Sequence, residues 1–379
     1  MVSQPAHYEL IPGTDVGGTS SAAKNRDKPV FYTLDGMRGV AALLVVLRHT
    51  THFFGDFGFQ ESYLAVDIFF AMSGVVLANA YEQRLKAGLS SKTFAWIRLV
   101  RLYPLYSLGL ALSVLALALG ADHEKANWLP WTLPLAVFLL PDVLPFTGTS
   151  TFPLNGPSWS LFMEFWVNVI YGRFISALSS RNLLLIMAFS AAGLAVGEHL
   201  SKRHNLDFGW TQKSFAFAFF RVGYSYFFGV LLYRMFAASR FTGFTGNRSL
   251  TSWGLLLTMA ALLMCSPPPS LQPYFDFLCV TTVFPVIVYA ALYFQPNGHT
   301  RRICTFLGAI SYPAYAIHSP LAAFTETLLH TLAGLSVQDY APYSGIAFFG
   351  AFLPLCWVLN NYDVRIRAAL NPKRAKPVR

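Results

Sequence analysis

Long apolar segments recur along the chain and limit its fold more than any other feature of the sequence. They lie at about 34–54, 62–81, 98–119, 158–178, 183–200, 215–237, 250–266, 275–294, 303–332 and 344–363. Crossing the hydrocarbon core of a bilayer takes about 20 apolar residues of α-helix, and each segment comes close to that length. We therefore predict an all-α, multi-pass integral membrane bundle of about ten transmembrane helices.

One further apolar stretch differs from these ten because prolines interrupt it. Residues 128–147 contain Pro130, Pro134, Pro141 and Pro145. Proline removes a backbone donor and breaks the hydrogen-bond ladder of a helix interior, which a lipid-facing helix tolerates poorly. We predict that this stretch is a re-entrant or interfacial segment and not a full span.

The distribution of positive charge tests this topology. Hydrophobic residues make up 54% of the chain and charged residues 12%, yet the formal net charge is +10. With ten spans, 22 of the 28 Lys and Arg residues fall on the side of the N-terminus and four on the other side. Cytoplasmic loops show this excess. The basic composition therefore reflects topology in a lipid bilayer, and we expect no nucleic-acid partner.

The same pattern predicts how the chain is organised. Residues 1–30 are expected to form a flexible cytoplasmic tail, residues 31–363 a membrane domain, and residues 364–379 a basic cytoplasmic tail. Both termini are thus predicted in the cytoplasm, on a multi-pass protein of the inner (cytoplasmic) membrane.

Five ionisable residues in the predicted spans are candidates for function: Arg38, His49, Asp67, Glu164 and His318. A charged group at bilayer depth costs on the order of 2.5–3.5 kcal/mol to insert, so each requires a partner or a role. Arg38 and His49 are eleven residues apart, about three turns along nearly one helix face. We expect them to line one groove, although Arg38 as a helix-end anchor and His49 as a packed core histidine are the alternatives.

Two carboxylates are predicted at the depth of His49. Asp67 and Glu164 lie about five and six residues into spans that both begin on the outer side. A carboxylate beside a histidine fixes its tautomer and stabilises the imidazolium, as a general base requires. We predict that Asp67 and Glu164 hold His49 in this way. The alternative is a structural hydrogen-bond cluster that locks three helices together.

His318 lies about halfway along its span. Ser311, Tyr312, Tyr315 and Ser319 accompany it at helical spacing, so these hydroxyls are candidates to line a polar path. Packing in the core is the alternative for His318.

Two arginines begin the third span on its cytoplasmic side. Arg98 and Arg101 are three residues apart and share one helix face. Guanidinium groups bind phosphate oxygens in a bidentate way, so this pair suits a polyphosphate such as that of coenzyme A. An ordinary cytoplasmic loop with excess positive charge is the alternative.

Five ordered patterns are similar to those of the membrane acyltransferase-3 family, the bacterial O-acyltransferases of surface polysaccharides and related products. The resemblance covers about residues 31–363. Its patterns are LDGMRGVAALLVVLRH with Arg38 and His49, VDIFFAMSG at 66–74, RLVR with Arg98 and Arg101, PSWSLFMEF at 157–165, and FLGAISYPAYAIHSP at 306–320. The resemblance implies transfer of an acyl group, usually acetyl, from cytoplasmic acyl-CoA to a hydroxyl of an exported or lipid-linked glycan.

The resemblance also implies roles for the candidate residues. Arg38, Arg98 and Arg101 are expected to hold the phosphates of the acetyl-CoA donor. His49 is expected to act as a base or as a transient acyl carrier. Orientation and charge balance are expected from Asp67 and Glu164, with His318 as a further catalytic candidate, and no metal is expected.

Two departures from the family pattern affect this interpretation. The family often carries a second acid after the SWSL run, where this chain has Phe165, so Glu164 would serve alone. Some members also have a C-terminal hydrolase-like domain, which these residues lack. The membrane domain is therefore expected to complete the transfer or to pass the acyl group to a polysaccharide-assembly protein.

Other functions remain open from the sequence. Intramembrane carboxylates and histidines also occur in secondary transporters and exporters. Within acyl transfer, a small-molecule acceptor or a succinyl donor fits equally well.

Overall fold

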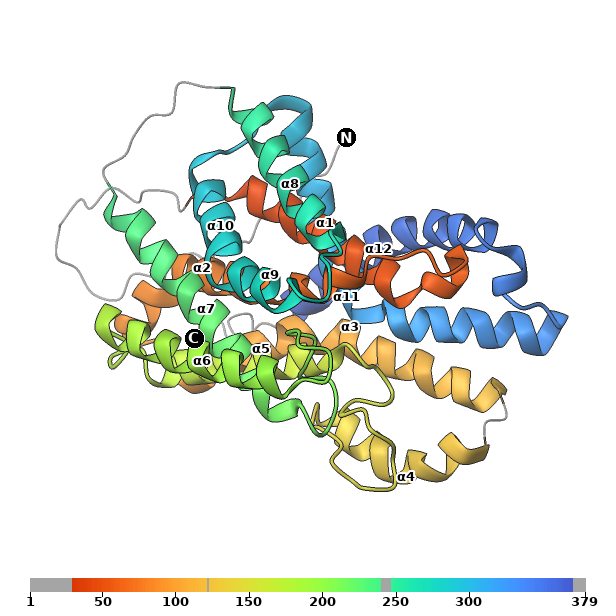
Figure 1. The fold of residues 1–379 in the computed structure, drawn as a ribbon. Helices are drawn as coiled ribbons and strands as arrows, with labels where there is room; N and C mark the ends of the chain where they lie inside the picture. Colours follow the sequence, from red (N-terminus) through yellow and green to blue (C-terminus); the bar gives the residue numbers. More distant parts are fainter. Residues whose placement is uncertain (1–28, 121–122, 240–246, 371–379) are drawn as a thin grey trace, which may run out of the picture.

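The computed structural model describes residues 29–120, 123–239 and 247–370. These residues are largely helical (Figure 1), and Ser150 and Thr211 form an isolated β-bridge. The α-helices are α1 (Tyr32–His49), α2 (Ala65–Lys86), α3 (Ser91–Gly120), α4 (His123–Val137), α5 (Ser158–Arg173), α6 (Ser180–Leu200), α7 (Phe215–Ala238), α8 (Arg248–Met264), α9 (Gln272–Leu278), α10 (Phe284–Tyr293), α11 (Gly298–Ala333) and α12 (Tyr343–Ala369). Short 3₁₀ turns cover Thr51–Phe54, Gln60–Leu64 and Gln338–Tyr340, and a π turn, Cys279–Val283, joins α9 to α10. The predicted all-α class is confirmed.

Six described helices are long and apolar enough to cross a membrane: Glu61–Lys86, Ser91–Gly120, Ser180–Leu200, Phe215–Ala238, Gln272–Tyr293 and Tyr343–Ala369. All ten predicted segments coincide with helices, but α5 has only 16 residues. α1 and α11 are continuous helices that carry the polar residues discussed below. The architecture is thus that of a multi-pass membrane protein, while the count of ten spans stays a prediction.

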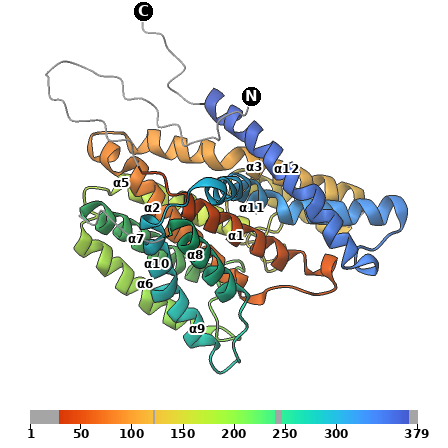
Figure 2. The ribbon, with the colours of Figure 1, turned by 90° about the horizontal axis from the view of Figure 1, so that it is seen from above.

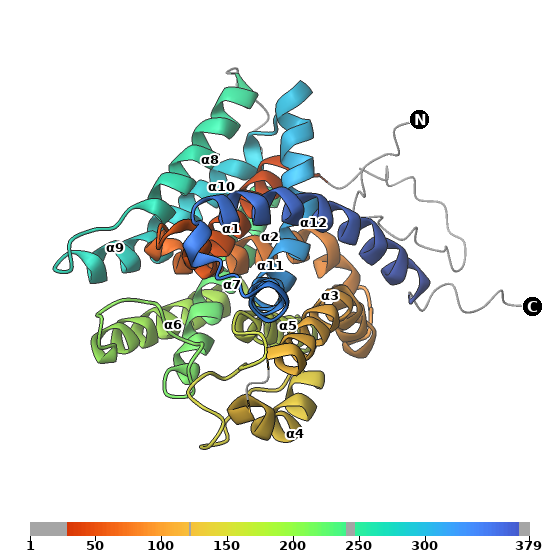
Figure 3. The same ribbon diagram turned by 90° about the vertical axis from the view of Figure 1, so that its right-hand side faces the viewer.

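Helix α11 lies between α1 on one side and α3 on the other, and it also contacts α12 (Figures 2 and 3). Small residues allow the close approach of α1 and α11. A Cβ atom added at Gly39 would lie 2.4 Å from Cβ of Leu307, and one added at Gly308 would lie 2.6 Å from Cβ of Asp35. Such contacts are how helices pack in membranes, where apolar burial alone drives little association. This packing brings the end of α1 against the middle of α11.

Contacts between helix ends agree with the two sides that the charge pattern predicts. At the expected cytoplasmic side, Nε of Arg234 at the end of α7 donates to the Glu82 carboxylate at the end of α2, 3.0 Å away. At the other side, the Tyr63 hydroxyl before α2 donates to Asp276 in α9 at 2.5 Å. Helix ends predicted on one side therefore meet each other. Which side faces the cytoplasm stays a prediction.

The first half of the stretch 128–147 is helical. Pro130 and Pro134 lie inside helix α4, and the irregular chain begins only after Val137. With 15 residues, α4 is about 22 Å long at 1.5 Å per residue, which is short for a full span. Its re-entrant or interfacial placement stays a prediction.

The boundary at residue 363 between the membrane domain and the C-terminal tail stays a prediction. Helix α12 continues to Ala369, because Asp363 accepts a charged contact from Arg367 one turn later, with Oδ2 and Nη2 2.8 Å apart. Residues 371–379 and residues 1–28, which the sequence assigns to the two tails, lie outside the described residues.

Candidate active site

His49 is the last residue of α1. Its Nδ1 atom lies 2.8 Å from the carbonyl oxygen of Val45, one turn earlier in the same helix. The side chain is exposed, although protein atoms surround it closely. The side chain therefore lies at the protein surface, at a position that a ligand can reach.

His318 approaches His49 from α11 and is fully buried. Its Nε2 atom lies 3.2 Å from Nδ1 of His49, and the two ring centroids are 5.0 Å apart. Its own Nδ1 lies 2.9 Å from the carbonyl oxygen of Tyr315 and 3.1 Å from that of Ala314. The contact joins residues 269 positions apart in the sequence.

The partners of these rings decide where their protons lie. A backbone carbonyl only accepts, so Nδ1 of His318 carries the proton and Nε2 of the neutral ring is an acceptor. Nδ1 of His49 faces that acceptor and the carbonyl of Val45, so it carries a proton as well. Among the described residues, Nε2 of His49 has no hydrogen-bond partner. A lone pair is thus available on Nε2 of the exposed His49 side chain.

Asp67 does not hold His49, and this part of the prediction is wrong. Its carboxylate pairs with Arg221 of α7, with Oδ2 2.5 Å from Nη2, and each side chain is 1% exposed. Arg221 also donates to the carbonyl oxygens of Phe208 and Tyr63, each at 3.0 Å. Because the guanidinium is fixed on three sides, the pair is a structural lock between α2, α7 and the loop before α7.

Glu164 does not hold His49 either. Its Oε1 atom accepts from Nη2 of Arg98 at 2.9 Å and from the hydroxyl of Ser73 at 3.0 Å. The expected layer of one histidine and two carboxylates is therefore replaced by separate ion pairs. Each carboxylate takes the nearest arginine, because an uncompensated charge of either sign is costly at this depth.

Tyr315 links the histidine pair to the neighbouring helices. Its ring centroid lies 6.0 Å from that of His318 and 5.4 Å from that of Phe69 in α2. Its hydroxyl lies 2.5 Å from Oγ of Ser160 in α5. The helices that carry Asp67 and Glu164 thus reach His318 through this tyrosine.

The three predicted phosphate-binding arginines are all paired with carboxylates. Arg38 contacts Asp35 at 3.4 Å in α1, and Arg98 contacts Glu164. Arg101 contacts Asp363 of α12 at 3.4 Å, and its guanidinium lies 4.8 Å from the ring centroid of Tyr312. Their side chains are 11–23% exposed.

Two of these arginines, Arg38 and Arg101, lie near neighbouring turns of α11. Gly308 packs on Asp35 beside Arg38, and one turn later the Tyr312 hydroxyl donates to the carbonyl oxygen of Leu102 beside Arg101. A polyphosphate there would have to compete with the carboxylates. In the described part of the chain, no group of three or more His, Cys, Asp or Glu side chains is placed to hold a metal ion.

Sequence reasoning missed Arg221, Arg48 and Asp207. Arg221 lies in an apolar segment, as Asp67 does, and two opposite charges at bilayer depth were a signal for a pair. Arg48 was visible as the neighbour of His49, but its partner Asp207 lies in a loop 159 residues away. No pattern in the sequence connects the two.

Comparison with known proteins identifies the family of the chain. The family model described as an acyltransferase domain matches residues 31–360. The chain is also similar to "Protein 2 in picA locus" from Rhizobium radiobacter, with 41% identity over 179 residues, which are 44% of this chain and 93% of that protein. No solved structure matches the chain. The match over residues 31–360 covers the histidine pair and all three arginines, so this multi-pass membrane protein belongs to the acyltransferase-3 family and is an acyltransferase.

Proposed function

We propose that the protein is an O-acyltransferase that moves an acetyl group from acyl-CoA to a hydroxyl of a surface or exported polysaccharide, or of its lipid-linked precursor. One observation carries the proposal: the His49 side chain is exposed, and His318 contacts its ring at Nδ1. A neutral imidazole held in this way is suited to accept a hydroxyl proton near neutral pH.

The reaction then needs one base. Nε2 of His49 takes the proton of the acceptor hydroxyl, and the oxygen attacks the carbonyl carbon of the thioester. The carbon–sulfur bond breaks, and the leaving thiolate takes the proton back from Nε2. The products are the O-acyl ester and free coenzyme A, and His49 returns to its starting state.

His318 replaces the predicted carboxylates as the orienting group. Its Nε2 lone pair accepts from Nδ1 of His49 before and after His49 is protonated. Because His318 is fully buried, a second positive charge there would be costly. The charge therefore stays on His49, whose side chain is exposed.

Arg38, Arg98 and Arg101 are proposed to bind the phosphates of the donor. Arg38 and His49 are eleven residues apart on one helix, which is about 16 Å at 1.5 Å per residue. An extended acyl-CoA whose phosphates lie at Arg38 could present its thioester near His49. The phosphates would exchange places with the carboxylates of Asp35, Glu164 and Asp363.

The acceptor and the setting follow from the family and the charge pattern. We propose a glycan or lipid-linked glycan acceptor, a bacterial inner membrane, and both termini in the cytoplasm. The donor then enters from the cytoplasm and the acceptor reaches His49 from the outer side or along the bilayer. Polysaccharide-assembly proteins are proposed as partners.

Release of free coenzyme A tests the proposal. The purified protein in lipid is given acetyl-CoA with polysaccharide from the host strain whose ester groups have been removed by mild base. We expect coenzyme A release that depends on this acceptor and is abolished by His49→Ala. No release by the well-folded wild-type protein would refute the proposal, and acetyl found on His49 without acceptor would make it an acyl carrier.

A further inference from the structure

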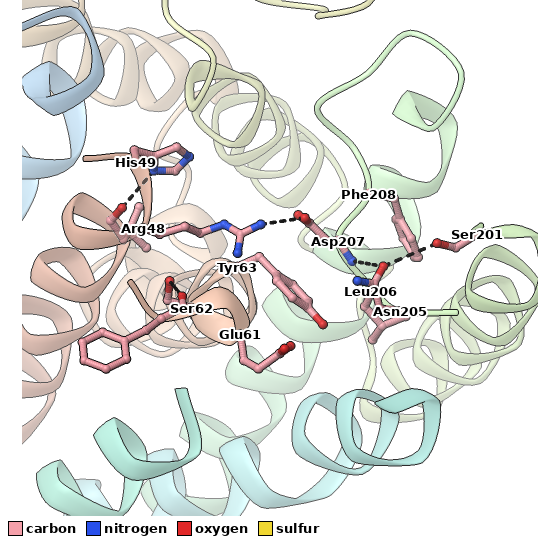
Figure 4. A network of polar contacts seen from close by, with 12 residues as sticks. Arg48, His49, Glu61, Ser62, Tyr63, Ser201, Asn205, Leu206, Asp207 and Phe208 are labelled. Carbon is pink, nitrogen blue, oxygen red and sulfur yellow. Dashed lines mark hydrogen bonds and ion pairs between the residues drawn. The ribbon is translucent and has the colours of Figure 1, made fainter. Parts of the chain in front are cut away.

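The loop of residues 201–214, between α6 and α7, lies against the end of α1 that carries His49 (Figure 4). Its backbone is fixed on both sides of Asp207. The amide of Leu206 donates to Oδ2 of Asp276 at 2.8 Å, and the carbonyl oxygen of Phe208 accepts from Arg221 at 3.0 Å. Further along, the carbonyl oxygen of Trp210 accepts from the amide of Thr151 at 3.0 Å. The position of Asp207 is therefore set by the fold.

Asp207 directs its carboxylate to Arg48, the residue before His49. Oδ2 of Asp207 lies 2.7 Å from Nη2 of Arg48, and Figure 4 shows Arg48 extended from the end of α1 towards the loop. The guanidinium carbon of Arg48 also lies 5.2 Å from the ring centroid of Tyr63. The ion pair is thus held beside the proposed base.

Accessibility separates this pair from the structural lock of Asp67 and Arg221. The side chains of Arg48 and Asp207 are 16% and 15% exposed, whereas those of the lock are 1% exposed. A buried pair can only hold the fold together. A pair that is partly open beside an exposed His49 can also contact a ligand that reaches the base.

The chemistry of the pair fits a ligand with several hydroxyl groups. A guanidinium donates through its N–H groups and a carboxylate accepts through its oxygens, so the partly exposed pair presents both kinds of hydrogen-bonding group to a ligand. A hydroxyl both donates and accepts, and neighbouring hydroxyls of a sugar can engage the two groups together. An acceptor with a single hydroxyl would place that group at His49. It would then have no second hydroxyl to form hydrogen bonds with Arg48 and Asp207.

We propose that Arg48 and Asp207 bind a sugar hydroxyl next to the one that is acylated, and so select polyhydroxylated acceptors over water. This inference rests on the proposed function and adds an acceptor subsite to it. Asp207 accepts from the neighbouring hydroxyl and Arg48 donates to it. Because the loop is fixed, the Arg48 and Asp207 side chains keep a constant position relative to His49.

Selectivity between two acceptors tests the subsite. The full-length protein in lipid is given acetyl-CoA, and two rates are measured: acetyl transfer to the de-esterified host polysaccharide, and hydrolysis to free acetate. Water is the acceptor in the second reaction and cannot use the subsite. We expect Asp207→Asn to lower the ratio of transfer to hydrolysis about tenfold or more, the effect of weakening a hydrogen bond to a charged group.

A matched control and a second variant complete the design. Glu198→Gln makes the same chemical change near the start of this loop, where Glu198 faces His204 at 3.6 Å, and it should leave the ratio unchanged. Arg48→Lys keeps the positive charge but loses the planar guanidinium with its several N–H donors. Its ratio of transfer to hydrolysis should therefore lie between those of the wild type and Asp207→Asn. Thermal unfolding of each variant checks that the fold is kept.

The other results overturn the inference. If Asp207→Asn slows transfer and hydrolysis by the same factor, the pair serves only to hold the loop. An unchanged ratio in a well-folded Asp207→Asn protein also refutes the subsite. If the wild type transfers nothing to the polysaccharide, the proposed function itself fails, and the subsite with it.

Discussion

Replacing His318 by phenylalanine would test whether the histidine pair works as proposed. The side chain is fully buried, and phenylalanine fills a similar volume without the acceptor at Nε2. Nδ1 of His49 would lose its 3.2 Å contact and keep the carbonyl of Val45 at 2.8 Å. The tautomer of His49 should therefore survive while its imidazolium becomes less stable.

The size of the effect follows from the contact that is lost. A hydrogen bond to a charged group contributes about 1.5–3 kcal/mol, which corresponds to roughly a 10- to 150-fold fall in kcat at 1.4 kcal/mol per factor of ten. His49→Gln removes the base itself and should leave almost no activity. His318→Gln keeps an acceptor oxygen, so we expect it to recover part of the rate that His318→Phe loses.

The assay is the rate of coenzyme A release at saturating acetyl-CoA and acceptor, with thermal unfolding measured for each variant. A folded His318→Phe protein with the wild-type kcat would show that the pair has no role in the reaction. If His318→Phe is as inactive as His49→Gln and His318→Gln is no better, His318 is itself the base. The buried ring would then have to become accessible during the reaction.

Three further predictions concern the ion pairs and the topology. Arg98→Ala should raise KM for acyl-CoA about tenfold, with a smaller change in kcat, because a phosphate contact is remote from the reacting atoms; kinetics with acyl-CoA varied check this, and a fall in kcat alone would contradict it. Asp67→Ala should destabilise the fold by about 3–5 kcal/mol, because Arg221 is left buried and unpaired; thermal unfolding measures this, and an unchanged transition would show that the lock carries no stability. In a variant without native cysteines, an impermeant thiol reagent added to intact cells should label Arg203→Cys and not Ser90→Cys, and the reverse result would invert the topology.

Much of the fold could be predicted from the sequence, because the length of an apolar segment has a direct physical meaning. All ten predicted segments coincide with helices of the structure. The structure differs from the sequence-based expectation where contacts between helices determine the bounds of a helix. Helix α12 runs past residue 363 because Asp363 contacts Arg101 and Arg367, and α4 includes two of the prolines that the sequence counted against a full span.

The candidate site shows where sequence reasoning ended. The cost of charge in lipid identified His49, Asp67, Glu164 and His318 as residues that need partners. Counting residues along a helix also predicts the depth of each of these residues in the bilayer. It does not predict their positions in the plane of the bilayer. Depth alone placed both carboxylates at His49, and this was wrong.

Only the tertiary structure decided which partner each residue takes. The rotation of a helix about its axis, and the choice of its neighbour, come from packing over long sequence separations. Small residues bring α1 against α11, so His49 meets His318 across 269 positions, while α7 delivers Arg221 to Asp67 across 154. The sequence by itself therefore determined that this is a helical membrane protein with candidate histidines in its spans, and the packing determined that His318 is the residue that contacts His49.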